Sequence, residues 1–166
     1  MAFRKYAEIG DVLVAFDLNY ESKPFLEDPA QPAPTLLHEE TNLWSHKGIK
    51  HSKDLGGVPD YLITRQSKCG KVALDKPLLA VVVAKKDDLQ GGWAQCAMEM
   101  YAMQQINGKP ETPIFGTVSN GDQWEFARLQ GQVLTQMPLS LPVMPLDQVY
   151  AMLCTHGTLC STRSQN

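Results

Sequence analysis

The feature that most constrains the fold is an apolar run, Leu78-Leu79-Ala80-Val81-Val82-Val83-Ala84, which ends on two lysines, Lys85 and Lys86. Valine and leucine on both faces of such a run are typical of a strand in the middle of a sheet, covered on both sides. An almost uncharged stretch follows from Leu89 to about Ile106, and Asp88 stands where a helix N-cap is expected. This order predicts a central strand followed by a helix packed on its sheet.

The rest of the pattern predicts an α/β domain whose mixed sheet has about four to five strands, with helices packed on it. We expect residues 1–160 to form one domain and residues 161–166 to be a flexible tail. Asp60–Arg65 is expected to be the strand next to Leu78–Lys85. The other expected elements are strands at Ile9–Asp17, Ile114–Val118 and Trp124–Leu129, the last two a hairpin around Asn120-Gly121, and helices at Thr35–His46 and Leu146–Thr155.

The composition bounds the class of protein. A chain of 166 residues with 43% hydrophobic content can bury one substantial core. No apolar run approaches membrane-spanning length, and the N-terminal residues form no secretory signal, so we expect a soluble, cytoplasmic protein without a membrane partner.

Charge is unevenly distributed along the chain. The net charge is −3, yet the stretch from Lys47 to Lys86 holds nine basic and three acidic residues, against six basic and fifteen acidic elsewhere. Such a stretch is either a solvated basic face or a local phosphate-binding surface.

An acid and a lysine are expected to meet at one end of the sheet. Side chains alternate along a strand, so Val81, Val83 and Lys85 point to one face. Asp60, at the start of the neighbouring strand, should lie close to Lys85. A carboxylate and a lysine around a divalent cation are groups that support phosphodiester hydrolysis. A second acidic ligand would be expected at position 83, which is valine.

Two other carboxylates could complete such a site. Glu99 is the one charged residue between Gly92 and Ile106, and Glu40 falls within the apolar residues of the expected helix Thr35–His46. A carboxylate in apolar surroundings is costly unless it is paired or metal-bound. For Glu99 two interpretations remain open. It is either a partly exposed surface residue or it faces the polar cleft that holds Lys85.

In this order, the helix with Glu40, the pair Pro59-Asp60, the strand ending Val83-Ala84-Lys85 and the helix with Gln95 and Glu99 resemble the PD-(D/E)XK, or restriction-endonuclease-like, superfamily. The chain is most similar to the nuclease-like domains of type I restriction subunits, and residues 114–126 resemble the hairpin after their core helix. The resemblance covers about residues 36 to 130 and implies a restriction-endonuclease-like sandwich, with a central mixed sheet flanked by helices.

The resemblance also implies a function, namely hydrolysis of DNA with Mg²⁺ or Mn²⁺, in a homodimer or a larger restriction-type complex. Asp60, Glu99 and Glu40 would be catalytic metal ligands and Lys85 would act at the water or phosphate. The residues expected to contact the substrate are Lys86, Gln95 and Lys53.

The chain departs from the family at Val83, where the family has Asp or Glu. Three explanations remain open. The chain is a non-cutting relative that binds nucleic acid or a protein partner, or the valine is an engineered or accidental replacement of Glu, or the acid has migrated to the next helix as Glu99.

Overall fold

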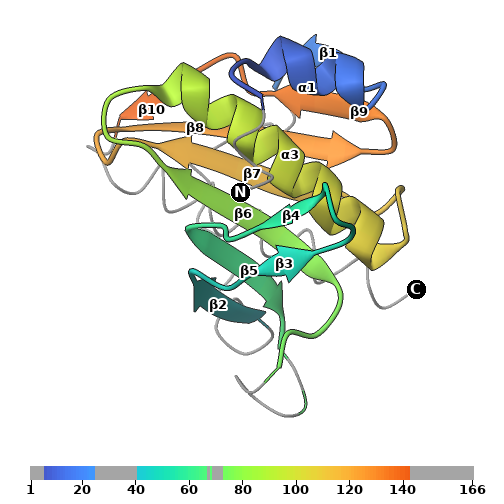
Figure 1. Cartoon of the computed structure of the whole chain (residues 1–166). Helices are drawn as coiled ribbons and strands as arrows, with labels where there is room; N and C mark the ends of the chain where they lie inside the picture. The colour runs from blue at the N-terminus through green and yellow to red at the C-terminus, as the bar shows by residue number, and fades with distance from the viewer. Residues whose placement is uncertain (1–5, 25–40, 67, 69–72, 143–166) are drawn as a thin grey trace.

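The computed structural model describes residues 6–24, 41–66, 68 and 73–142. Glu40, the expected helix Leu146–Thr155 and the expected tail lie outside these residues. The described part is a mixed α/β structure with two helices, α1 (Ile9–Ala15) and α3 (Leu89–Asn107), and an eight-stranded sheet (Figure 1). This confirms the predicted α/β class.

The sheet has the strand order β1-β9-β8-β7-β6-β5-β2, with β10 paired to β8, and a separate hairpin joins β3 to β4. The strands are β1 (Asn19–Ser22), β2 (Thr41–Ser45), β3 (Ile49–Lys50), β4 (Gly56–Gly57), β5 (Tyr61–Arg65), β6 (Leu78–Ala84), β7 (Ile114–Ser119), β8 (Gln123–Gln130), β9 (Val133–Gln136) and β10 (Leu141–Pro142).

Strand β6 lies in the middle of this sheet, as its valine content predicts. It pairs with β5 in antiparallel orientation and with β7 in parallel orientation, and α3 is the crossover between β6 and β7. The prediction that β5 and β6 are neighbours is therefore confirmed. So is the hairpin, because β7 and β8 are antiparallel and Gly121 in their turn has a φ of 97°.

Helix α3 extends across the sheet on the side that carries α1 (Figure 1). Its ends are those predicted, because the Asp88 side chain accepts a hydrogen bond from the Gly91 N–H and Gly108 closes the helix with a φ of 66°. One core cluster joins buried residues of α1, α3, β6 and β7, among them Val12, Ala97 and Val118. The core therefore holds α3 rigidly against the strands that end near Lys85.

The strand predicted at Ile9–Asp17 is wrong, because this segment forms helix α1. Val12 is fully buried, and Ile9, Leu13 and Phe16 pack against the same core. These positions recur every three to four residues, which is the period of a helix. The partial alternation of this segment favoured a strand, but the spacing of its buried residues is that of a helix.

The helix predicted at Thr35–His46 is wrong over the described residues, because Thr41–Ser45 form strand β2. Leu43 is 55% exposed while Trp44 is buried, so the two lie on opposite sides of a strand. The Trp44 indole N–H donates to the Thr64 hydroxyl at 2.9 Å, across the pairing of β2 with β5.

The sheet is also wider than the predicted four to five strands. Strands β9 and β1 extend the width of the sheet beyond β8. They pair with each other in parallel from Asn19↔Val133 to Ser22↔Gln136. Both are four residues long and rich in polar side chains, so neither gives a clear alternating pattern in the sequence.

Candidate functional site

Polar side chains from three elements meet where β6 ends. The Lys85 ammonium donates to the Gln95 Oε1 at 2.9 Å, and the Gln95 amide donates in turn to the Glu99 Oε1 at 2.9 Å. Asp60 accepts a hydrogen bond from the Ala84 N–H, 2.8 Å from its Oδ2. Asp60, Lys85, Gln95 and Glu99 are called the acid–lysine cluster below.

The backbone explains why these residues meet. Because β5 and β6 are antiparallel, the start of β5 lies beside the end of β6, which places Asp60 next to Ala84 and Lys85. Gln95 and Glu99 are four residues apart on α3, so their side chains are neighbours on one side of the helix. The geometry thus brings Asp60, Lys85, Gln95 and Glu99 to one end of the sheet, and the catalytic and substrate-binding roles expected of them stay predictions.

Two glycines let the helix approach the sheet closely. A Cβ atom on Gly92 would lie 2.6 Å from the Val118 Cγ1 and 3.0 Å from the Lys85 Cγ, closer than real contacts allow. A Cβ atom on Gly116 of β7 would lie 2.8 Å from the Cys96 Sγ. The absence of side chains at these positions keeps α3 low over the ends of β6 and β7, and the Lys85 stem lies against Gly92.

Glu99 is completely buried, which overturns the interpretation that it is a partly exposed surface residue. Burial raises the pKa of its carboxyl from 4.5 to about 8. The hydrogen bond from Gln95 opposes this rise in pKa, the charge of Asp60 adds to it and the charge of Lys85 lowers it. The same electrostatics show that Asp60 and Lys85 both lie near Glu99.

One oxygen of the cluster has no hydrogen-bond partner among the described residues. It is the buried Oε2 of Glu99, whose Oε1 is bonded to Gln95. A buried polar atom without a partner is costly, and a bound cation would satisfy it. Mg²⁺ is commonly held by one or two carboxylates together with water and substrate phosphate, so Asp60 and Glu99 are the side chains of this cluster that could hold it. Within the described residues, no group of three or more His, Cys, Asp or Glu side chains that could hold a metal ion is found.

Val83 does not line an open cleft beside Lys85, because its side chain is completely buried. It belongs to the core cluster together with Val81 and Val118, and Val118 is its partner on β7. It does share the α3 side of the sheet with Lys85, as strand alternation predicts. Position 83 is therefore an apolar contact beneath the cluster.

The other predicted site residues are less closely connected with this cluster. Lys86 is exposed just after β6. Lys53 is exposed in the loop between β3 and β4, and within the described residues no hydrogen bond or ion pair joins it to Asp60 or Lys85. The third expected metal ligand, Glu40, lies outside the described residues.

Sequence reasoning passed over His46, which the structure places beside Asp60. The His46 N–H donates to the Asp60 backbone carbonyl at 3.0 Å, and His46 adopts a left-handed φ of 51°. Its Nδ1 lies 2.7 Å from the Ser45 hydroxyl, and its ring is 6.3 Å from that of Tyr61. A non-glycine residue in this conformation stores strain, which is often found next to functional sites. No local sequence pattern marks it, because its place depends on the pairing of β2 with β5.

Comparison with known proteins gives no external guide. No family model, no curated protein and no solved structure matches the chain. Among the described residues, no helix has the length and apolar content needed to cross a membrane.

Proposed function

We propose that this protein is a nuclease that hydrolyses DNA with Mg²⁺, or Mn²⁺ in its place, at the acid–lysine cluster. The observation that carries the proposal is the meeting of two carboxylates, a lysine and a glutamine where β5 begins and β6 ends, with one buried carboxylate oxygen that has no partner among the described residues. Charged groups are expensive to bury, so a cluster of this kind is a candidate for chemistry.

The finer fold assignment, a restriction-endonuclease-like sandwich, belongs to the same proposal. It is supported by the order of the elements, in which the strands after Asp60 and before Lys85 are neighbours and α3 connects β6 to the parallel strand β7. Four residues of the resemblance, Asp60, Lys85, Gln95 and Glu99, thus lie at one end of one sheet.

Each residue of the cluster has a role in the proposed reaction. Asp60 and Glu99 would hold the metal ion, which when bound polarises the phosphate and acidifies a bound water. Lys85 orients the attacking water or stabilises negative charge on the phosphate. Gln95 positions the Lys85 ammonium and the Glu99 carboxylate through its two hydrogen bonds. Glu99 must lose its proton before it can bind a cation, because a ligating carboxylate is ionised.

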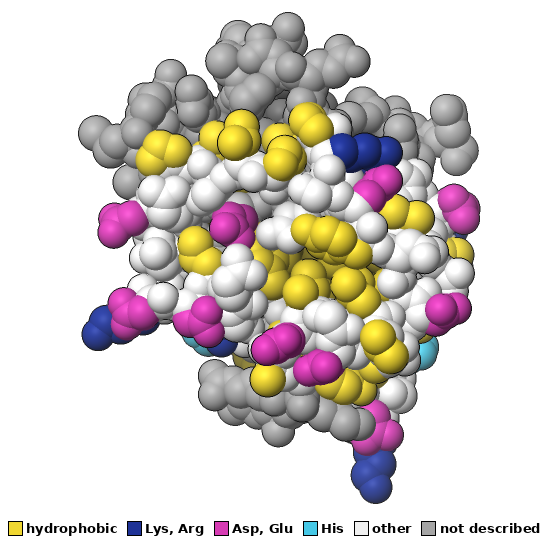
Figure 2. All heavy atoms as spheres, turned by 90° about the horizontal axis from the view of Figure 1, so that it is seen from above, with side chains coloured by type: hydrophobic (Ala, Val, Ile, Leu, Met, Phe, Trp, Pro, Cys, Tyr) yellow, Lys and Arg dark blue, Asp and Glu magenta, His cyan; other side chains and the backbone are white. Residues whose placement is uncertain are grey.

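The charge distribution supports approach of a polyanion near the cluster. Lys86 is exposed directly after β6, next to Lys85 of the cluster. Figure 2 shows a different surface, at the end of the molecule that carries α1 and β1, where the described charged side chains are mostly Asp and Glu. A DNA backbone would therefore meet the β5–β6 end of the sheet, and binding would weaken as salt rises.

Cleavage assays test the proposal with matched variants. The wild type should cleave single- or double-stranded DNA in Mg²⁺ or Mn²⁺, and EDTA should stop it. Lys85→Met and Glu99→Gln should each lower the rate roughly a hundredfold or more, as loss of one charge-stabilising group does in other active sites. Lys109→Met, an exposed lysine after α3, should cut like the wild type. Cleavage that survives both site variants would disprove this assignment.

Val83 favours a second candidate, a non-cutting relative that binds nucleic acid or a protein partner. A buried valine in the core shows that position 83 contributes packing rather than a ligand. Salt-sensitive DNA binding without cleavage in any divalent metal would support this candidate over the nuclease.

A further inference from the structure

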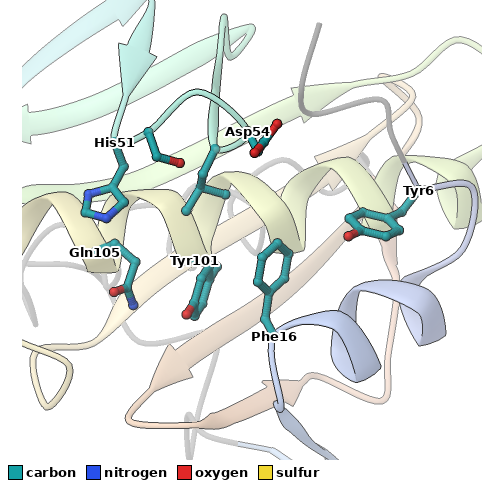
Figure 3. Close-up of a pocket in the computed structure, with 8 residues that line it drawn as sticks. Tyr6, Phe16, His51, Asp54, Tyr101 and Gln105 are labelled. Atoms are coloured by element: carbon teal, nitrogen blue, oxygen red, sulfur yellow. The ribbon is translucent and has the colours of Figure 1, made fainter.

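A second candidate site lies on the opposite side of α3 from the acid–lysine cluster. Aromatic side chains line an open cavity of about 270 Å³ there (Figure 3). Its rings come from Tyr6 before α1, Phe16 after α1 and Tyr101 on α3. Residues two apart on a helix point in nearly opposite directions, so Tyr101 faces away from the cluster that holds Glu99. This cavity is called the aromatic pocket below.

The rings form a packed apolar wall. Phe16 and Tyr101 are stacked with centroids 4.4 Å apart and an interplanar angle of 24°. Tyr6 meets Phe16 edge-on at 6.1 Å. All three residues are only partly buried, so the wall is in contact with solvent. Exposed, pre-ordered aromatic rings are surfaces on which planar groups stack.

Polar groups of complementary kinds surround this wall. Asp54 and His51 belong to the loop between β3 and β4, and Gln105 belongs to the last turn of α3. An ionised Asp only accepts hydrogen bonds, while Gln both donates and accepts. Within the described residues, none of these three side chains forms a hydrogen bond to the protein. They can therefore bind the edge of a planar polar ring.

The surrounding charge favours one class of ligand. Lys50 and Lys53 are exposed on the hairpin that carries His51 and Asp54. An alkylammonium ion stacked on these rings would lie close to the two lysines, and repulsion between the like charges would oppose its binding. A ring with a phosphate attached gains from the same lysines. The cavity lies just below the roughly 300–1,000 Å³ of pockets for drug-sized ligands, which suits a single ring system.

We propose that the aromatic pocket binds a nucleobase, stacked on the aromatic wall, with its phosphate toward Lys50 and Lys53. The ligand is a free nucleotide or an unpaired residue of a nucleic-acid strand, since the two present the same chemistry. The proposal goes beyond the nuclease activity and uses none of the residues of the acid–lysine cluster, so either can hold without the other.

Calorimetric titration of the full chain, without divalent metal, tests the proposal with the four common nucleoside 5′-monophosphates and with ribose 5-phosphate. At least one nucleotide should bind, and ribose 5-phosphate should bind at least tenfold more weakly because it has no base to stack. Equal binding of ribose 5-phosphate, or no binding of any nucleotide up to millimolar concentration, would overturn the proposal.

Variants locate the binding site. Tyr101→Leu should weaken the best nucleotide roughly five- to a hundredfold, the range found when a stacking ring is removed. Asp54→Asn should weaken it at least threefold, and because Asp54 is exposed this variant should fold. Glu111→Gln, an exposed acid in the α3–β7 connection, is the control and should bind like the wild type. Unchanged affinity in Asp54→Asn and in any folded Tyr101→Leu protein would disprove the site.

Competition experiments distinguish the two sources of ligand. A short single-stranded oligonucleotide that binds at least tenfold tighter than the mononucleotide, and loses this advantage when abasic, identifies a strand as the ligand. A mononucleotide that binds tighter than the oligonucleotide identifies a free nucleotide. Equal competition by a blunt, fully paired duplex would overturn the proposal, because a paired base cannot enter the pocket.

Discussion

The two sides of α3 hold carboxyl groups in opposite surroundings. On the sheet side Glu99 is completely buried, and its carboxyl is hydrogen-bonded to Gln95. On the outer side Asp54 is exposed beside the aromatic pocket. The Glu99 carboxyl has a pKa of about 8 because burial disfavours its charge.

The two environments favour different functions. Burying a charged carboxylate costs free energy unless a cation binds to it, so a buried carboxylate suits metal chemistry. An exposed carboxylate costs little and can exchange water for a ligand, which suits recognition. If this distinction is right, similar substitutions on the two sides of α3 should have very different effects on stability.

The largest effect is expected from Val83→Glu, which adds a third carboxylate, beneath Asp60 and Glu99 of the cluster. Without metal the free energy of unfolding should fall by about 3–5 kcal/mol, as for an uncompensated buried charge. Mg²⁺ should restore part of this loss, because the new carboxylate adds an oxygen ligand and the ion binds the folded state. Urea unfolding with and without Mg²⁺ measures both effects.

Val58→Glu is the control for this substitution, because Val58 is 48% exposed. It should change stability by no more than about 0.5 kcal/mol. Equal losses of stability for Val58→Glu and Val83→Glu would contradict the burial of position 83. A folded Val83→Glu protein whose stability does not change with Mg²⁺ would argue against a vestigial metal ligand at this position.

A slightly smaller effect on the free energy of unfolding is expected when the pH is changed. The folded protein keeps the Glu99 proton up to about pH 8, whereas the unfolded chain loses it near pH 4.5. The free energy of unfolding should therefore fall by a few kcal/mol as pH rises through this window, since a difference of one in pKa corresponds to about 1.4 kcal/mol. Below pH 4.5 this contribution is constant. Denaturant titrations of wild type and Glu99→Gln at several pH values measure it, and the variant should show a shallower dependence. Identical pH profiles would show that Glu99 is not the source.

Gln95→Leu should cost about 1–2 kcal/mol, because it removes two hydrogen bonds within the cluster. The pKa of Glu99 should also rise, since the Gln95 hydrogen bond lowers it. Carbon-detected NMR of the glutamate carboxyls follows this pKa. Gln105→Leu, on the same helix but without a side-chain hydrogen bond within the described residues, is the control. A lower pKa of Glu99 in Gln95→Leu would contradict the assigned geometry.

The smallest effect is expected from Asp54→Asn, the acid-to-amide change on the outer side of α3. Stability should change by less than about 0.5 kcal/mol, because the side chain is exposed and makes no hydrogen bond within the described residues. Thermal unfolding beside the wild type measures it. A loss above 1 kcal/mol would show that Asp54 supports the hairpin rather than standing free for a ligand.

The sequence predictions were correct where a long segment had the periodicity of only one kind of element. The valine run of β6 and the uncharged stretch of α3 predicted the strand, the helix and the packing of one on the other, and Asp88 was predicted as the helix N-cap. Long periodic segments leave few alternatives. Strand and helix geometry then brought Asp60, Lys85 and Glu99 together. What failed were short segments such as Ile9–Ala15 and Thr41–Ser45, where composition and period disagree and tertiary packing decides.

The aromatic pocket could not have been predicted from the sequence. Tyr6 and Phe16 flank α1 and Tyr101 lies on α3, so their meeting requires residues 9–15 to form a helix packed beside α3. A strand was predicted for residues 9–17 instead. The burial of Glu99 likewise depends on the separation between α3 and the sheet, which no spacing of residues along the chain reports.

That separation depends on Gly92, where a single added carbon would clash with Val118 and with the stem of Lys85. A methyl group there would lift the start of α3, admit water to the Glu99 carboxyl and return its acidity toward that of an ordinary glutamate. The proton affinity of Glu99 is therefore expected to depend on Gly92, seven positions earlier on the same helix, through the water that the close approach of α3 excludes.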